Sequence, residues 1–88
     1  MHKQNQFVDI DVQSAITAIE FDHYGQYLAI ASKDDVRVFY FRDFDKPVAV
    51  YDLKGVSRVA WSYTGDSDVA LWCLDTATKT LRKLCSGK

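Results

Sequence analysis

The sequence contains few of the residues that usually mark an enzyme, a metal centre or a disulfide-linked domain. It has two cysteines, two histidines, four glycines and one proline among 88 residues. Cys73 and Cys85 are too few for a disulfide framework, and without a nearby histidine they lack the spacing of a zinc site. No glycine-rich phosphate loop or nucleophilic serine motif is present. We therefore predict reduced thiols, no metal, no cofactor and no enzymatic activity.

An excess of one charge is also lacking. Eleven basic residues stand against twelve acidic ones, which gives a formal net charge of −1, whereas binding to nucleic acid or anionic membranes usually needs a basic excess. Apolar runs stay far below the ~20 residues that span a membrane. The first residues lack the apolar segment of a signal peptide. These features predict a soluble intracellular protein, nuclear or cytoplasmic, with no membrane partner and no small-molecule substrate.

What the sequence does contain is the alternating pattern of β-strands. Ile19 and Phe21 alternate with acidic residues, which is typical of a strand that buries one face. Turn signals near Gly25, at residues 33–34 and at residues 43–46 divide residues 15–54 into four short strands. A helical period can be read only weakly, in residues 76–84. The sequence therefore predicts an all-β fold with one antiparallel four-stranded sheet.

The same pattern predicts the core. We expect the apolar residues at alternate strand positions to be buried, and their equivalents later in the chain to pack beside them. The first group is Ile19, Phe21, Leu28, Ile30, Val36 and Val38, and the second is Val59, Trp61 and Leu71.

A repeat relates the two parts of the chain. Residues 16–25 align with residues 56–65, at an offset of 56 − 16 = 40 positions, which is within the spacing of propeller blades. Residues 35–41 align with residues 68–74 at an offset of only 68 − 35 = 33. The second unit is therefore interpreted as lacking its second strand. We predict three strands there, at 57–62, 69–74 and 80–84, with the first two paired as a hairpin that carries Trp61 and Trp72.

These residues resemble the WD repeat. The third strand of the first unit ends in Phe39-Tyr40-Phe41-Arg42-Asp43, and its counterpart in the second unit reads Leu71-Trp72-Cys73-Leu74-Asp75. Asp34 or Asp35, and Asp68, match the turn aspartate of that family. No Gly-His pair precedes either first strand, so the family's His–Asp hydrogen-bond network is not expected.

The resemblance covers about residues 15–84 and implies a β-propeller fragment within a single unit, 1–88. Residues 15–54 would form a complete blade and residues 55–85 a truncated one. Residues 19–31 and 36–39 are most similar to a late blade of the U-box splicing-factor ubiquitin ligases. The resemblance thus implies a non-catalytic protein–protein interaction scaffold within a larger complex, related to splicing or ubiquitin ligation.

Function in such a scaffold lies on the loops at the rims of the disc. The predicted partner-binding residues are in the first turn and in the third connection, which we expect on opposite rims: Asp22, His23 and Tyr24, and Arg42, Asp43, Phe44 and Lys46. His23 has no recognisable nucleophile beside it and is interpreted as a solvated turn residue. The acidic pair at residues 34–35 is interpreted as a charged turn.

Two alternatives remain open. In one, the aromatic residues at 39–44 form a stacking platform on a small nucleic-acid-binding β-barrel. In the other, the chain is a structural fragment whose partners are other proteins or further blades, and which self-associates when isolated because its strand edges are open.

Overall fold

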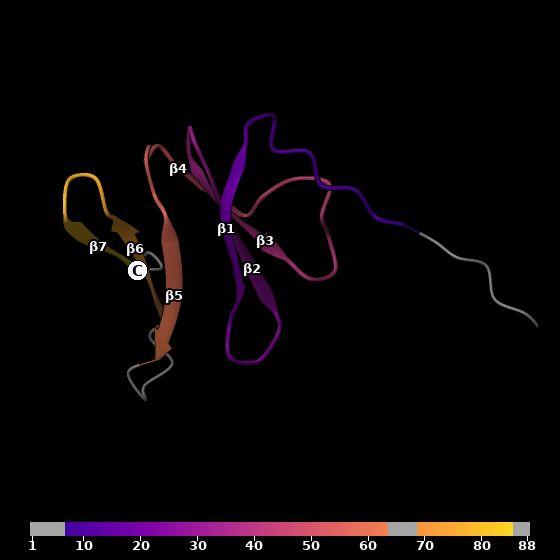
Figure 1. The fold of residues 1–88 in the computed structure, drawn as a ribbon. Helices are drawn as coiled ribbons and strands as arrows, with labels where there is room; N and C mark the ends of the chain where they lie inside the picture. The colour runs from indigo at the N-terminus through magenta and orange to yellow at the C-terminus, as the bar shows by residue number, and fades with distance from the viewer. Residues whose placement is uncertain (1–6, 64–68, 86–88) are drawn as a thin grey trace, which may run out of the picture.

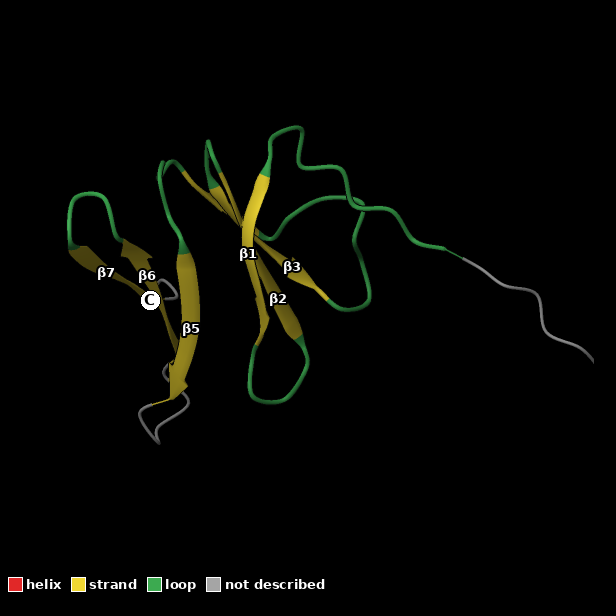
Figure 2. Cartoon of the chain, viewed as in Figure 1, coloured by secondary structure: helices red, strands yellow, loops and turns green. Residues whose placement is uncertain are grey.

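The computed structural model describes residues 7–63 and 69–85. The described residues form seven strands in two antiparallel sheets and no helix (Figures 1 and 2). The predicted all-β fold, with a four-stranded sheet and a partial second one, is confirmed. The first sheet has the order β1-β2-β3-β4 and the second the order β5-β6-β7. The strands are β1 (Ile16–Phe21), β2 (Tyr27–Ser32), β3 (Val36–Tyr40), β4 (Ala49–Tyr51), β5 (Arg58–Tyr63), β6 (Val69–Asp75) and β7 (Thr80–Cys85).

The first sheet is a meander whose turns lie where the sequence predicted them. Gly25 has a φ of 73°, and its N–H donates to the Asp22 carbonyl at 3.0 Å. Ser32 closes the β2–β3 turn because its hydroxyl accepts from the backbone N–H of Asp34 and of Asp35, each at 3.2 Å. Such local hydrogen bonds stabilise a tight turn and fix the register of the strands that it joins.

The second sheet has the three predicted strands, and β5 pairs directly with β6 as expected. The prediction that the second unit lacks its second strand was wrong, however. In a meander the third strand runs parallel to the first, but β6 runs antiparallel to β5 and is therefore the counterpart of β2. The strand without a counterpart in the described part of the second sheet is thus β4. Residues 76–84 form a turn and most of β7 rather than a helix.

The pairing registers support this assignment residue by residue. The row Phe21–Leu28–Phe39 across β1, β2 and β3 corresponds to the row Trp61–Leu71–Leu84 across β5, β6 and β7. The next row, Ile19–Ile30–Arg37, likewise corresponds to Val59–Cys73–Arg82. The predicted turn residue Asp68 lies outside the described residues.

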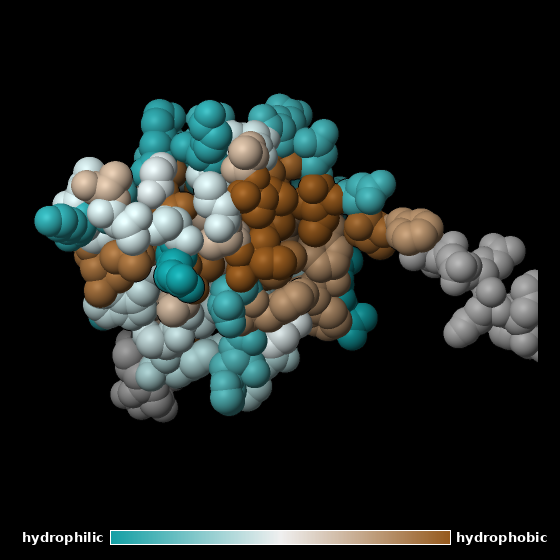
Figure 3. Space-filling model, viewed as in Figure 1, coloured by the Kyte–Doolittle hydropathy of each residue, from teal (hydrophilic) through white to brown (hydrophobic). Residues whose placement is uncertain are grey.

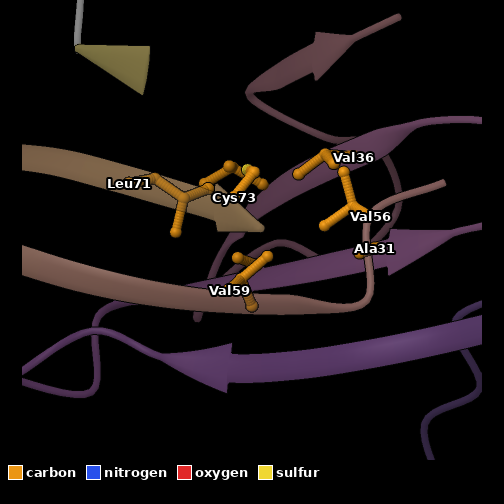
Figure 4. Close-up of a cluster of buried hydrophobic side chains, with 8 residues drawn as sticks. Ala31, Val36, Val56, Val59, Leu71 and Cys73 are labelled. Carbon is orange, nitrogen blue, oxygen red and sulfur yellow. The ribbon is translucent and has the colours of Figure 1, made fainter. Parts of the chain in front are cut away.

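The core lies between the two sheets and is made of small side chains (Figure 4). Ala29, Ala31 and Val36 of the first sheet are completely buried, and they pack with Val59 and Cys73 of the second. Two hydrogen bonds join β1 to the later segment. Thr17 Oγ1 donates to the Val56 carbonyl at 2.7 Å, and Trp61 Nε1 donates to the Glu20 carbonyl at 2.9 Å. The second sheet is therefore held by packing and by polar contacts to β1.

Two residues of the predicted core are not buried. Ile19 is 57% exposed and Phe21 is 51% exposed. The alternation in β1 was interpreted correctly, but its apolar side chains share a face with Ile30 and Leu28 that points away from the second sheet. The remaining predictions of buried core residues in β2, β3, β5 and β6 hold, except that Trp61 is only partly buried. A smaller cluster on that outer face consists of Val12, Leu28, Ile30 and Phe39, with Ile10 and Phe44 at its margin.

Candidate interaction surfaces

The two loops predicted to bind partners lie at the same end of the first sheet, not on opposite rims. The N–H of Phe41 donates to the Gln26 carbonyl at 2.8 Å, which joins the third connection to the first turn. The physical reason is that β1 and β3 run parallel in a meander, so the loops that follow them share an end (Figure 2). We call residues 22–26 and 41–47 the loop rim.

Asp22 organises the loop rim rather than contacting solvent. Its side chain is buried, and Oδ1 accepts from the backbone N–H of Gln26 at 2.6 Å and of Tyr27 at 3.0 Å. The Tyr63 hydroxyl, from the end of β5, donates to Oδ2 at 2.8 Å. Burial raises the pKa of the Asp22 carboxyl, but the hydrogen bonds from Tyr27, Tyr63 and Gln26 outweigh it, so the pKa lies below its usual value. The predicted role of Asp22 as an exposed contact is therefore corrected.

Three aromatic rings pack together at the loop rim, and one of them, Tyr63, binds this carboxylate. His23, Tyr24 and Tyr63 pack edge to face, with ring centroids 5.1 to 5.8 Å apart. Tyr24 is 71% exposed and His23 is also exposed. Burial and the neighbouring Asp22 carboxylate raise the pKa of the Tyr63 hydroxyl. The sequence did not predict Tyr63 as part of this surface. The repeat offset of 40, which pairs position 23 with position 63, was the available signal.

The third connection adds a second group of exposed side chains. The Arg42 guanidinium lies 4.9 Å from the centroid of the Phe41 ring, and Phe41 is 39% exposed. Arg42, Asp43 and Lys46 are exposed as predicted. Phe44 is instead half-buried against Phe39, with 6.2 Å between the ring centroids, so it anchors the third connection to the first sheet.

A third surface is the outer side of the first sheet. We call the exposed apolar side chains of Ile19, Phe21 and Val50 on that side the open face; Val50 is 54% exposed and pairs with Arg37 in the same row as Ile19. Phe7 and Val8, which precede the first sheet, are also largely exposed. Figure 3 shows a continuous hydrophobic patch over β1 that extends toward the N-terminal segment. Patches of this kind mark sites of association.

The described residues contain no cluster of three or more His, Cys, Asp or Glu side chains that could hold a metal ion. No helix long and apolar enough to cross a membrane occurs in that part of the chain. Cys73 is buried and free, and burial raises the pKa of its thiol.

Neither a protein-family model nor a curated protein matches this chain. The resemblance to the WD repeat therefore stays a prediction.

Proposed function

We propose that this chain is a non-catalytic protein–protein interaction scaffold built from face-to-face sheets, of the kind found in WD-repeat propellers, within a larger intracellular complex. The observation that carries the proposal is the open face. Its residues Ile19 and Phe21 are the counterparts of Val59 and Trp61, the side chains by which β5 packs on the first sheet. The same kind of surface thus occurs twice in the chain, once covered and once exposed.

The energetics favour covering the open face. Burying an aliphatic or aromatic side chain fully contributes about 1.5–3 kcal/mol. Because Ile19 and Phe21 are each about half exposed, a sheet that covers them gains about 1 kcal/mol from each of these side chains. Further gain comes from Val50 and from the segment around Val8.

The loop rim supplies a second contact surface in this proposal. Tyr and Arg are enriched among the residues that dominate binding energy at protein interfaces. Tyr24 and Arg42 are both exposed, and they lie against the rings of His23 and Phe41, respectively. Asp22 and Tyr63 hold this surface in place from beneath through their hydrogen bond. Partners of the rim would therefore be other proteins, with splicing or ubiquitin ligation as the setting that the WD-repeat resemblance favours.

The alternative of a nucleic-acid-binding β-barrel has less support. The described strands form two open sheets, and the aromatic stretch at residues 39–44 does not form a platform. Phe39 is buried and Phe44 is half-buried, which leaves Phe41 as its most exposed phenylalanine. The net charge of −1 also gives little attraction for phosphates.

Sedimentation equilibrium of the 88-residue chain tests the proposal. We expect the chain to self-associate at micromolar concentrations, because none of the described residues covers its open face, and we expect Ile19→Ser/Phe21→Ser to weaken this association. The double variant should not lose much stability, since both side chains are already half exposed. Tyr24→Ser is the matched control, because it removes an exposed large side chain from the loop rim and leaves the open face intact.

A sharp monomer at all concentrations, with cooperative melting, would mean that the chain closes its own core and does not stack. Equal weakening by the control variant would place the association on the loop rim instead of the open face.

A further inference from the structure

None of the described strands pairs with the outer edge of β7, and the corresponding edge in the first sheet is paired. In the first sheet, β4 pairs with β3 and places Val50 opposite Arg37. Arg82 is the counterpart of Arg37, but in the described part of the second sheet β7 is the last strand. Every second residue of β7 therefore turns its backbone N–H and C=O toward this edge without a strand partner.

Arg82 also lacks the acidic neighbour that Arg37 has. Asp35, two residues before Arg37, forms an ion pair with its guanidinium at 3.1 Å. The corresponding residue before Arg82 is Thr80, which has no charge. Among the residues that the structure describes, no carboxylate lies within ion-pair distance of Arg82. A strand that pairs with β7 can supply the missing charge.

A pocket on the same side of β7 can receive a side chain from such a strand. Its volume is about 310 Å³, and it lies between β6, β7 and the connection from β4 to β5. Leu53, Val56 and Cys73 provide apolar walls and Arg82 provides positive charge, while the ammonium of Lys54 already lies 3.7 Å from the Asp52 carboxylate. Asp75 also lines the pocket, and its Oδ1 accepts from the N–H groups of the following turn. A glutamate suits these walls, because its methylene groups can contact the apolar residues while its carboxylate pairs with Arg82.

We propose that the open edge of β7 binds an extended strand of another protein, antiparallel or parallel to β7, with an acidic side chain opposite Arg82. A second copy of β7 is a poor occupant. Antiparallel pairing of two copies near the centre of the strand would place Arg82 or Lys83 opposite Arg82 or Lys83, and like charges in cross-strand positions are destabilising. This inference does not depend on stacking at the open face, because the edge belongs to the other sheet.

Peptide titration of the 88-residue chain tests this inference. The probe is the acetylated heptapeptide Thr-Val-Thr-Glu-Thr-Val-Thr, and the comparison peptide has lysine in place of glutamate. We expect the glutamate peptide to bind about fivefold to tenfold more tightly, since the change exchanges attraction for repulsion at the exposed Arg82. Hydrogen exchange should show new protection of β7 amides in the complex.

Two charge reversals locate the contact. Arg82→Glu should invert the preference, so that the lysine peptide binds more tightly. Lys83→Glu makes the same charge change on the adjacent residue, which points to the opposite face beside Trp72, and should leave the preference in place. Equal binding of both peptides, or protection on β1 or β4 instead of β7, would overturn the proposal. Stronger self-association of Arg82→Glu with protection of β7 would show a second copy as the occupant and would overturn it as well.

Discussion

Replacing Tyr63 with phenylalanine should weaken the contact between the two sheets without changing the core. The substitution removes only the hydroxyl, which donates to Asp22 Oδ2 at 2.8 Å and accepts from the backbone N–H of His23 at 3.2 Å. A hydrogen bond to a charged group contributes about 1.5–3 kcal/mol. Because Tyr63 is partly exposed, we expect Tyr63→Phe to lower the free energy of unfolding by about 1–2 kcal/mol at neutral pH.

The pH dependence separates this hydrogen bond from a packing effect. The pKa of Asp22 lies below its ordinary value of 3.8 in the folded chain. Its carboxylate therefore stabilises the fold above pH 3.8, and this contribution is lost as the pH falls through the folded pKa. Tyr63→Phe lacks one of the hydrogen bonds that lower this pKa, so the stability difference between wild type and variant should shrink in acid.

The alkaline side gives a second check. The pKa of Tyr63 is raised above its ordinary value of 10.0, so folding favours the protonated hydroxyl. This contribution is complete below pH 10.0 and is lost as the pH rises through the folded pKa. The variant has no hydroxyl at this position and should lack this loss.

Urea unfolding followed by tryptophan fluorescence measures both effects across the pH range. Tyr51→Phe is the matched control, because its side chain packs against the core and its hydroxyl makes no hydrogen bond in the described part of the chain. A destabilisation by Tyr63→Phe that stays constant from neutral to acid pH would refute the assignment of the hydrogen bond to a charged Asp22.

Three further substitutions and one chemical reaction check the packing. Trp61→Ala should lower the free energy of unfolding by urea by about 2–4 kcal/mol, since it removes core contacts. Phe21→Ala should lower it by only about 1 kcal/mol, because that ring is half exposed. Equal losses would contradict the assignment of the two faces of the sheet. Gly55→Ala should destabilise by about 1–2 kcal/mol, because Gly55 has a φ of 79° and an added Cβ would lie 3.2 Å from Asp75 Oδ2; an unchanged melting temperature would contradict this. The Cys73 thiol, which is buried and has a raised pKa, should react with iodoacetamide much more slowly in the folded chain than in urea, and equal rates by peptide mass spectrometry would show that this part of the core opens readily.

The strands of this chain could be predicted from local features, because alternation and turn chemistry act over a few residues. The β1–β2 hairpin is an example. Ile19 and Phe21 alternate with polar residues, and Gly25 provides the turn. The pattern could not show which face of β1 the second sheet covers, since alternation separates the apolar face from the polar face but does not say which of them packs against a neighbour. The covered face is instead marked by the small residues Ala18 and Ala29, which do not stand out in a hydrophobic pattern.

Predicting the strands of the second unit correctly required the direction of each strand, which residue types do not encode. Trp72 was aligned with Phe39 because both are aromatic and follow aliphatic residues. In the structure Trp72 occupies the position of Ala29 in the second strand, opposite Lys83 of β7. Sequence similarity alone therefore assigned the correct number of strands and the wrong identity to two of them, β6 and β7.

The loop rim was only partly predictable for a related reason. Turn position indicated that His23 and Tyr24 are exposed, and both are. The burial of Asp22 depends on Tyr63, which is distant in sequence and reaches Asp22 only because β5 lies beside β1. A carboxylate that closes a hydrogen-bond network cannot be distinguished from a solvated one before its partners are known.

The small side chains of β2 have a consequence for the curvature of a larger assembly. Ala29 and Ala31 are fully buried, and among the described strands of the first sheet only β1 and β2 come close to β5. The two sheets therefore diverge from β1 toward β4 and β7, and a rotation rather than a simple translation relates one to the other. Adding sheets by the same operation turns the stack through a constant angle at each step. A larger side chain at position 29 or 31 would push β5 away from β2, so the small volume of these two alanines sets the angle between the two sheets.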